Sequence, residues 1–119
     1  MAEAKLYEGG CHCGKVRFSV RADITQAYEC NCSICMKRGA LWNFVDASSF
    51  TLKRGEDALT DYQFNQKRIH HLFCSTCGTA SFARGAKPDG TPVVALNLRC
   101  LDDLDLAPLP RVAIDGKSL

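Results

Sequence analysis

The sequence has no long hydrophobic run. Its longest aliphatic stretch covers only residues 93–96, far fewer than the roughly 20 apolar residues that a membrane-spanning helix needs. The first seven residues include Glu3 and Lys5 and contain no apolar core of the kind found in a secretion signal. We therefore expect a cytoplasmic protein with no membrane partner.

The sequence also lacks a block of like charges. Its 15 Lys and Arg residues nearly balance 13 Asp and Glu residues, which leaves a formal net charge of +2 spread along the chain. Because nucleic acids and anionic membranes bind clustered basic residues, we expect no nucleic-acid partner. Hydrophobic residues make up 46% and charged residues 24%, as in ordinary globular proteins. At 119 residues the chain has the length of one domain, so we predict a single domain over residues 1–119.

Helical periodicity is missing as well, because no segment repeats apolar residues at helical spacing for more than two turns. Short segments rich in aromatic or β-branched residues, bounded by turn-forming residues, instead predict strands. These segments are residues 14–21, 41–46, 60–64, 69–73, 79–84 and 92–98. At most one short helix could follow Cys32, over residues 33–38. The sequence therefore predicts a mainly β domain of six to eight short, mostly antiparallel strands.

Several local features refine this prediction. Residues 9–10, 54–57 and 87–90 have the composition of turns, and residues 47–50 could form one more turn. In residues 60–64 the alternation suggests that Thr60, Tyr62 and Phe64 point inward. Trp42 and Phe44 are expected in the core, with contact to a substrate as the alternative. The tail, residues 102–119, has two prolines and no clear period, which predicts an extended strap on the surface.

Cysteine is the one residue type present in excess, with eight copies. Seven of them form three short clusters and the eighth, Cys100, stands alone. The clusters are Cys11 with Cys13; Cys30, Cys32 and Cys35; and Cys74 with Cys77. In a chain without a secretion signal thiols stay reduced, and plentiful reduced cysteines usually hold a metal.

The first and third clusters together supply the four thiolates of a tetrahedral zinc site. Such a site would join the N-terminal strand to a hairpin in the second half of the chain, which is typical of a structural zinc. Gly78, directly after Cys77, permits the positive φ that a Cys-x-x-Cys-Gly turn often needs. The middle cluster has only three thiolates, and three protein ligands with one open position are typical of a catalytic zinc.

Three alternatives remain at this stage. The cysteines could form disulfides, although a Cys-x-Cys bridge is strained and an oxidising compartment is required. The middle cluster could be a second structural site, closed by Cys100 or by one of the histidines His12, His70 and His71. Cys100 could also be simple buried packing. Lys37 and Arg38 follow Cys35 closely enough to offset thiolate charge or to attract an anionic substrate.

In this order, the motifs resemble those of the glutathione-dependent formaldehyde-activating enzyme family, which includes the centromere protein V-like proteins. The similarity covers nearly the whole chain. It includes the Cys-x-Cys-Gly motif at Cys11, the Cys-x-Cys-x-x-Cys motif at Cys30, the Cys-x-x-Cys-Gly motif at Cys74, and residues 97–102.

The resemblance implies a small, zinc-stabilised β fold shaped like a tent of antiparallel sheets. It implies a structural zinc on Cys11, Cys13, Cys74 and Cys77. It also implies a second zinc, on Cys30, Cys32 and Cys35, at which the named enzyme handles the adduct of glutathione and formaldehyde.

Two functions are therefore expected from different classes. The first is a zinc-dependent carbon–sulfur lyase or synthase that acts on S-(hydroxymethyl)glutathione or a related thiol adduct, with Cys30, Cys32 and Cys35 as the catalytic cluster. Its partner would be a small-molecule thiol, possibly glutathione. The second is a non-enzymatic zinc module that binds another protein, as the centromere protein V-like members suggest.

Overall fold

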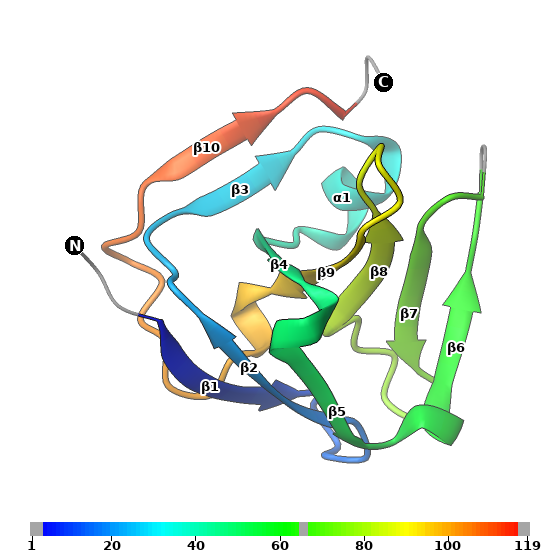
Figure 1. Cartoon of the computed structure of the whole chain (residues 1–119). Coiled ribbons are helices and arrows are strands. Elements are labelled where there is room, and N and C mark those ends of the chain that lie inside the picture. Colours follow the sequence, from blue (N-terminus) through cyan, green and yellow to red (C-terminus); the bar gives the residue numbers. More distant parts are fainter. Residues whose placement is uncertain (1–3, 65–66, 117–119) are drawn as a thin grey trace.

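The computed structural model describes residues 4–64 and 67–116, and these form two β-sheets (Figure 1). The smaller sheet has the strand order β1-β2-β5 and the larger has the order β10-β3-β4-β9-β8-β7-β6. The strands of the smaller sheet are β1 (Lys5–Gly10), β2 (Arg17–Ala22) and β5 (Phe50–Arg54). Those of the larger sheet are β3 (Ala27–Cys30), β4 (Trp42–Asp46), β6 (Leu59–Tyr62), β7 (His70–Cys74), β8 (Phe82–Ala86), β9 (Pro92–Asn97) and β10 (Arg111–Ile114).

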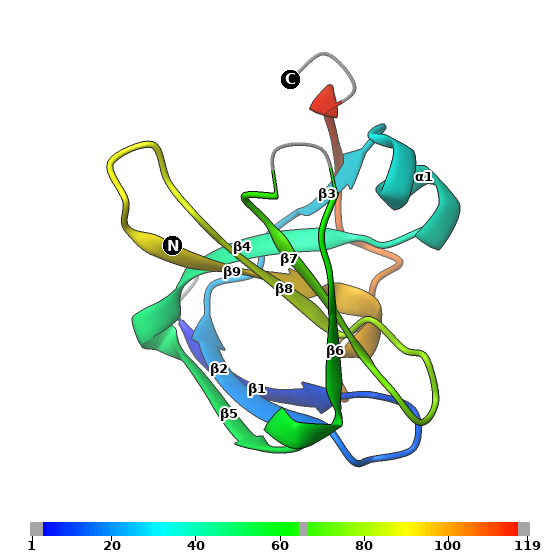
Figure 2. The ribbon, with the colours of Figure 1, turned by 90° about the vertical axis from the view of Figure 1, so that its right-hand side faces the viewer.

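Helical structure is confined to short pieces between strands. The α-helix α1 (Ser33–Arg38) follows β3, and three single-turn 3₁₀ helices are η1 (Ala47–Ser49), η2 (Glu56–Ala58) and η3 (Leu98–Cys100). Figure 2 shows the smaller sheet facing the strands β4, β9 and β8 of the larger one, with α1 at the opposite end of the molecule from the β1–β2 loop. The prediction of a mainly β fold with small sheets is confirmed.

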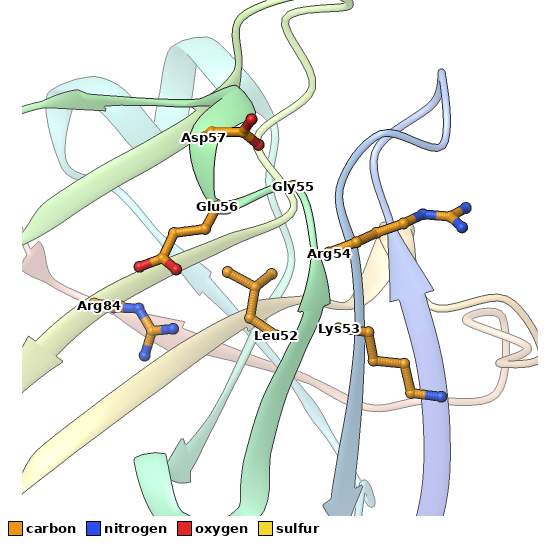
Figure 3. Close-up of a pocket in the computed structure, with 7 residues that line it drawn as sticks. All are labelled: Leu52, Lys53, Arg54, Gly55, Glu56, Asp57 and Arg84. Atoms are coloured by element: carbon orange, nitrogen blue, oxygen red, sulfur yellow. The ribbon is translucent and has the colours of Figure 1, made fainter.

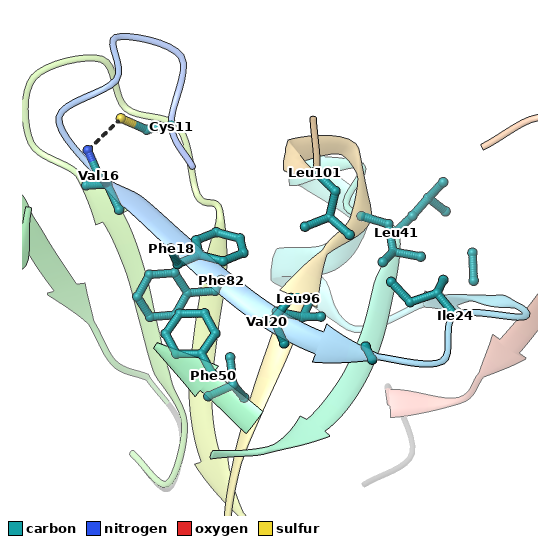
Figure 4. Close-up of a cluster of buried hydrophobic side chains, with 14 of the residues drawn as sticks. Cys11, Val16, Phe18, Val20, Ile24, Leu41, Phe50, Phe82, Leu96 and Leu101 are labelled. Atoms are coloured by element: carbon teal, nitrogen blue, oxygen red, sulfur yellow. Dashed lines mark hydrogen bonds between the residues drawn. The ribbon is translucent and has the colours of Figure 1, made fainter. Parts of the chain in front are cut away.

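The core fills the space between the two sheets (Figure 4). Phe18 from β2 lies 5.0 Å from Phe50 and 5.8 Å from Phe82, measured between ring centroids. Val20 in β2 and Leu96 in β9 are also fully buried. Phe18 and Val20 face the core because side chains two residues apart lie on the same face of a strand. This confirms the alternation that predicted the strand.

Most predicted strands occur within a few residues of their expected bounds, but the described residues contain ten strands rather than six to eight. Residues 9–10 are not a turn: they end β1 and pair with Phe18 and Arg17. The strand expected at residues 14–21 begins only at Arg17, because residues 11–16 fold back on themselves through the bond from Cys11 N to Val16 O, 3.0 Å. Residues 47–50 form η1 and the start of β5.

Three residues that were expected to face inward are exposed: Thr60, Tyr62 and Phe44. Tyr62 is 50% exposed and Thr60 is also exposed, because Leu59, one residue out of phase, is the side chain of β6 that packs against the core. Phe44 is 47% exposed and lies on the outer face of β4, where it contacts Tyr28 at 5.4 Å between centroids. Trp42 is buried as expected, but beneath α1 rather than in the main core.

The tail is extended, as predicted, but it is more than a strap. Its strand β10 pairs in parallel with β3, so that Ile114 lies beside Cys30. Residues 117–119 of the predicted strap lie outside the described residues. Among the residues described, no helix is both long and apolar enough to cross a membrane.

Candidate metal centres

The first thiol cluster brings together Cys11, Cys13, Cys74 and Cys77, whose Sγ atoms all lie within 4.8 Å of one another. Cys13 Sγ is 3.6 Å from Cys11 Sγ and 3.7 Å from Cys74 Sγ. Four sulfurs at about 2.3 Å from a tetrahedral zinc would be about 3.8 Å apart. The spacing and the chemistry of the four donors therefore fit a metal ion with a complete protein coordination shell.

Two loops form this cluster, one between β1 and β2 and the other between β7 and β8. Cys11 is anchored to the core because the Val16 N–H donates to its Sγ at 3.3 Å (Figure 4). In the other loop Gly78 has a φ of 80°, in the left-handed region, and its N–H bonds to the Cys74 carbonyl at 2.8 Å. This is the turn that the Cys-x-x-Cys-Gly motif predicts.

Neighbouring donors favour thiolates in this cluster. The hydroxyl of Thr79, 3.4 Å from Cys77 Sγ, together with the N–H groups of Thr79 and Cys13, lowers the pKa of Cys77 to about 5. The N–H of Cys77 lowers the pKa of Cys74 in the same way. Because thiolates rather than thiols bind metals, these contacts prepare the loop for a cation.

The second thiol cluster consists of Cys30, Cys32 and Cys35, again with all Sγ atoms within 4.8 Å. Cys30 ends β3, Cys32 is the residue before α1, and Cys35 lies in the first turn of the helix. One strand end and one helix start thus supply all three sulfurs. Within the described residues no His, Cys, Asp or Glu offers a fourth ligand atom to the cluster. The donor set suits a soft metal ion with one position left for another ligand.

Each sulfur of the second cluster has a different environment. Cys35 is buried, which raises the pKa of its thiol to about 12 when no cation is present. The Trp42 indole N–H donates to Cys35 Sγ at 3.3 Å and opposes that effect. Burial also disfavours the Cys32 thiolate, but the Cys35 thiol and the N–H of Cys35 outweigh it, so the pKa of Cys32 lies below its ordinary value.

The C-terminal segment closes one side of the second cluster. Asn31 N donates to the Ile114 carbonyl at 3.1 Å, and the Asn31 side chain donates to Asp115 at 2.8 Å. A Cβ atom on Gly116 would come within 2.5 Å of Cys30 Sγ. Only glycine therefore fits at this position without displacing the sulfur.

A cavity of about 330 Å³ lies beside the second cluster, with Cys30 and Cys35 among its lining residues. A larger hollow lies between η2 and the strands β5 and β8, where Glu56 and Arg84 face one side of Leu52 while Lys53 and Arg54 point away (Figure 3). No cysteine or histidine lines that hollow. Of these two hollows, the cavity at Cys30 and Cys35 is therefore the one that combines space with thiol side chains.

The structure places the other candidate ligands outside both clusters. Cys100 does not complete the second cluster: it is partly buried in η3, and burial and the charges of Cys11 and Cys77 raise the pKa of its thiol to about 11. His70 pairs with Asp61 at 2.7 Å, and His71 stacks on Phe64 at 5.1 Å. His12 is exposed and belongs to neither group.

A sequence model of the glutathione-dependent formaldehyde-activating enzyme family matches residues 6–114. The chain belongs to this family. The crystal structure of a Rhodobacter sphaeroides protein is similar to it, with a TM-score of 0.76 and 30% sequence identity. The match covers 88% of this chain and 99% of that one. Membership supports an activity connected with glutathione and formaldehyde, and a glutathione-type thiol or its adduct as the substrate.

Sequence reasoning found all seven clustered thiols but missed three residues around the second cluster. Trp42 was assigned first to the core, and its N–H bond to a thiol was not foreseen. Gly116 gave no signal, because its role depends on the pairing of β10 with β3. Arg99, which also lines the cavity, was noticed only as part of a longer motif.

Proposed function

We propose that the protein is a zinc-dependent carbon–sulfur lyase or synthase that acts reversibly on S-(hydroxymethyl)glutathione or a closely related thiol adduct. The contrast between the two clusters carries this proposal. Cys11, Cys13, Cys74 and Cys77 supply four sulfurs, which suits a structural zinc. The second cluster supplies three sulfurs beside a cavity, which suits a catalytic zinc.

In the synthetic direction the sulfur of the thiol adds to the carbon of formaldehyde. A C–S bond forms, the C=O double bond becomes a single bond, and the proton lost by the thiol ends on the new hydroxyl oxygen. The lyase direction reverses each change. A zinc ion held there would supply Lewis acidity, which favours the thiolate or polarises the oxygen.

The residues of the second cluster hold the site in shape for this reaction. Cys30, Cys32 and Cys35 would be the zinc ligands, and the Trp42 N–H fixes the orientation of Cys35 by bonding its sulfur. The walls of the cavity bring the thiol and the aldehyde together, which replaces a bimolecular encounter by a reaction within one site. Two-dimensional exchange NMR of formaldehyde with glutathione tests the proposal.

We expect the zinc-loaded protein to accelerate the exchange and a Cys32→Ser variant to lose the acceleration. A Cys100→Ser variant is the matched control, because Cys100 lies outside both clusters. If the fully zinc-loaded protein leaves the exchange rate of glutathione unchanged, the proposal is wrong. A zinc-dependent protein-binding module would then be the better explanation of the fold.

A further inference from the structure

The chain changes from strand to helix between Cys30 and Cys32. The strand β3 ends at Cys30, and Cys32 is the residue before α1. In a straight strand, residues two positions apart are separated by about 6.6 Å along the strand. The Sγ atoms of these two cysteines lie within 4.8 Å of each other. The conformation of the single residue between them, Asn31, therefore sets how the two sulfurs approach one metal ion.

The C-terminal segment holds Asn31 at two points. The backbone N–H of Asn31 donates to the Ile114 carbonyl at 3.1 Å, which continues the pairing of β10 with β3 (Figure 1). The side-chain Nδ2 of Asn31 donates to Asp115 Oδ1 at 2.8 Å. A hydrogen bond to a carboxylate is stronger than one between neutral groups. The two bonds together fix both the backbone and the side chain of the residue that separates the thiols.

The same segment also packs against the thiols themselves. A Cβ atom on Gly116 would lie 2.5 Å from Cys30 Sγ and 3.2 Å from the Cβ of Cys32. Residues 111–116 do not line the cavity of about 330 Å³ beside the cluster. The C-terminal segment and the cavity therefore adjoin different parts of the second cluster, so that the segment can support the ligands without blocking the cavity.

We propose that Asn31 and Asp115 form a clamp that positions Cys30 and Cys32 for one metal ion and slows the release of that ion. The inference rests on the second metal site of the function proposed above, and it adds positioning residues that are not themselves ligands. A sulfur must swing away before the ion can leave. Because Asn31 lies between the two cysteines, this movement strains its bond to Asp115.

The clamp also prepares the site before the ion arrives. A segment that is already fixed in its binding conformation loses less conformational freedom when it binds. Residues that support metal ligands from outside the coordination shell commonly change metal affinity by roughly 10–100-fold when they are mutated. Asn31 and Asp115 act one residue away from the ligands, so we expect an effect below this range.

Release of zinc from the loaded protein tests the clamp without any reaction of a substrate. An excess of a colorimetric chelator records the release from both clusters, and Cys32→Ser identifies the rate that belongs to the second. The test variants are Asp115→Ala, Asn31→Ala and the double variant. Both side chains are exposed, so these variants should fold, which circular dichroism melting checks. Asp103→Ala is the matched control, because Asp103 is an exposed acid of the same tail.

We expect Asp115→Ala and Asn31→Ala each to speed release from the second cluster about fivefold, the factor that corresponds to one ordinary hydrogen bond. The double variant should release zinc no faster than either single variant, because both changes remove the same bond. Asp115→Asn should behave nearly like the wild-type protein, since its amide oxygen can accept that bond. Release from the first cluster should stay unchanged in all of them, and Asp103→Ala should change neither rate.

Unchanged release from the second cluster in Asp115→Ala and Asn31→Ala would overturn the proposal. So would single effects that multiply in the double variant, or an Asp115→Asn variant as fast as Asp115→Ala, since charge rather than the bond would then be responsible. A wild-type protein that holds no metal at the second cluster would overturn both the clamp and the zinc site of the proposed function. Exchange NMR separates the two proposals otherwise: an effective clamp without acceleration refutes the enzyme alone, and acceleration with unchanged release refutes the clamp alone.

Discussion

Replacing Cys77 by serine tests whether a metal ion held by the first cluster stabilises the fold, because this change removes a ligand while removing few buried side-chain contacts. Cys74 is fully buried in the core, whereas Cys77 is only partly buried, so Cys77→Ser removes a ligand and little else. A structural zinc contributes about 10–16 kcal/mol in small domains, while a whole domain is stable by only about 5–15 kcal/mol. We expect a loss of at least about 5 kcal/mol. At roughly 4 °C per kcal/mol this lowers the melting temperature by about 20 °C or leaves the protein insoluble.

Cys32→Ser should destabilise the fold much less, because the cysteines of the second cluster are close together in the sequence. Cys13 and Cys74 are 61 residues apart in the chain, whereas Cys30 and Cys35 are separated by one short turn. At about 0.6 kcal/mol for each doubling of loop length, the longer link constrains the unfolded chain by about 2 kcal/mol more. A short Cys-x-Cys-x-x-Cys segment can also hold zinc when unfolded, which reduces the net stabilisation further.

The assay is circular dichroism melting combined with zinc analysis of both variants, with Cys100→Ser as the control for a partly buried cysteine outside the clusters. We expect each ligand variant to lose one zinc ion. Cys32→Ser should lose less than about 8 °C in melting temperature, which corresponds to about 2 kcal/mol. Equal loss of stability in Cys77→Ser and Cys32→Ser would refute the division into one structural and one open site.

Three further predictions concern the second cluster, a histidine and the core. Gly116→Ala should displace Cys30 Sγ, so that zinc analysis finds one metal ion fewer while the melting temperature changes little. Gly85→Ala is the control and should retain both metal ions, because a Cβ there would meet only an ordinary van der Waals contact. Burial lowers the pKa of His71, so below pH 6.5 the unfolded chain binds more protons and stability falls. Between pH 7.5 and pH 5.5, the free energy of unfolding measured in urea should therefore fall less in His71→Gln than in the wild-type protein. Phe18→Ala should cost about 3–5 kcal/mol in the same urea assay.

The two clusters of thiols were predictable because cysteine spacing is local information. Cys11 with Cys13, and Cys74 with Cys77, each form a turn whose geometry follows from a few adjacent residues. The preference of zinc for four thiolates predicted that the two pairs lie together, and the structure brings all four sulfurs within 4.8 Å of one another. The core strand around Phe18 was predictable for a similar reason, because its alternation has a period of two. These elements needed no knowledge of the tertiary structure.

The features that were missed depend on contacts between distant residues. The alternation of residues 60–64 suggested that Tyr62 faces the core. In the structure Leu59 packs against the core instead, so the side chains of β6 that are in phase with Tyr62 face outward. The strand β10 has a weak sequence signal and forms by pairing in parallel with β3. Gly116 and Arg99 acquire their positions near the thiols only through that pairing and through the bond to Gly39. No local pattern marks either residue.

Elemental analysis of freshly purified protein tests the central claim most directly. The account requires two zinc ions per chain, one for each cluster of thiols. A ratio near two in the wild-type protein, falling to one in Cys32→Ser with the fold retained, is the predicted result. A ratio near one would show that Cys30, Cys32 and Cys35 hold no zinc in the purified protein, and a ratio near zero would contradict the metal-based account of both fold and function.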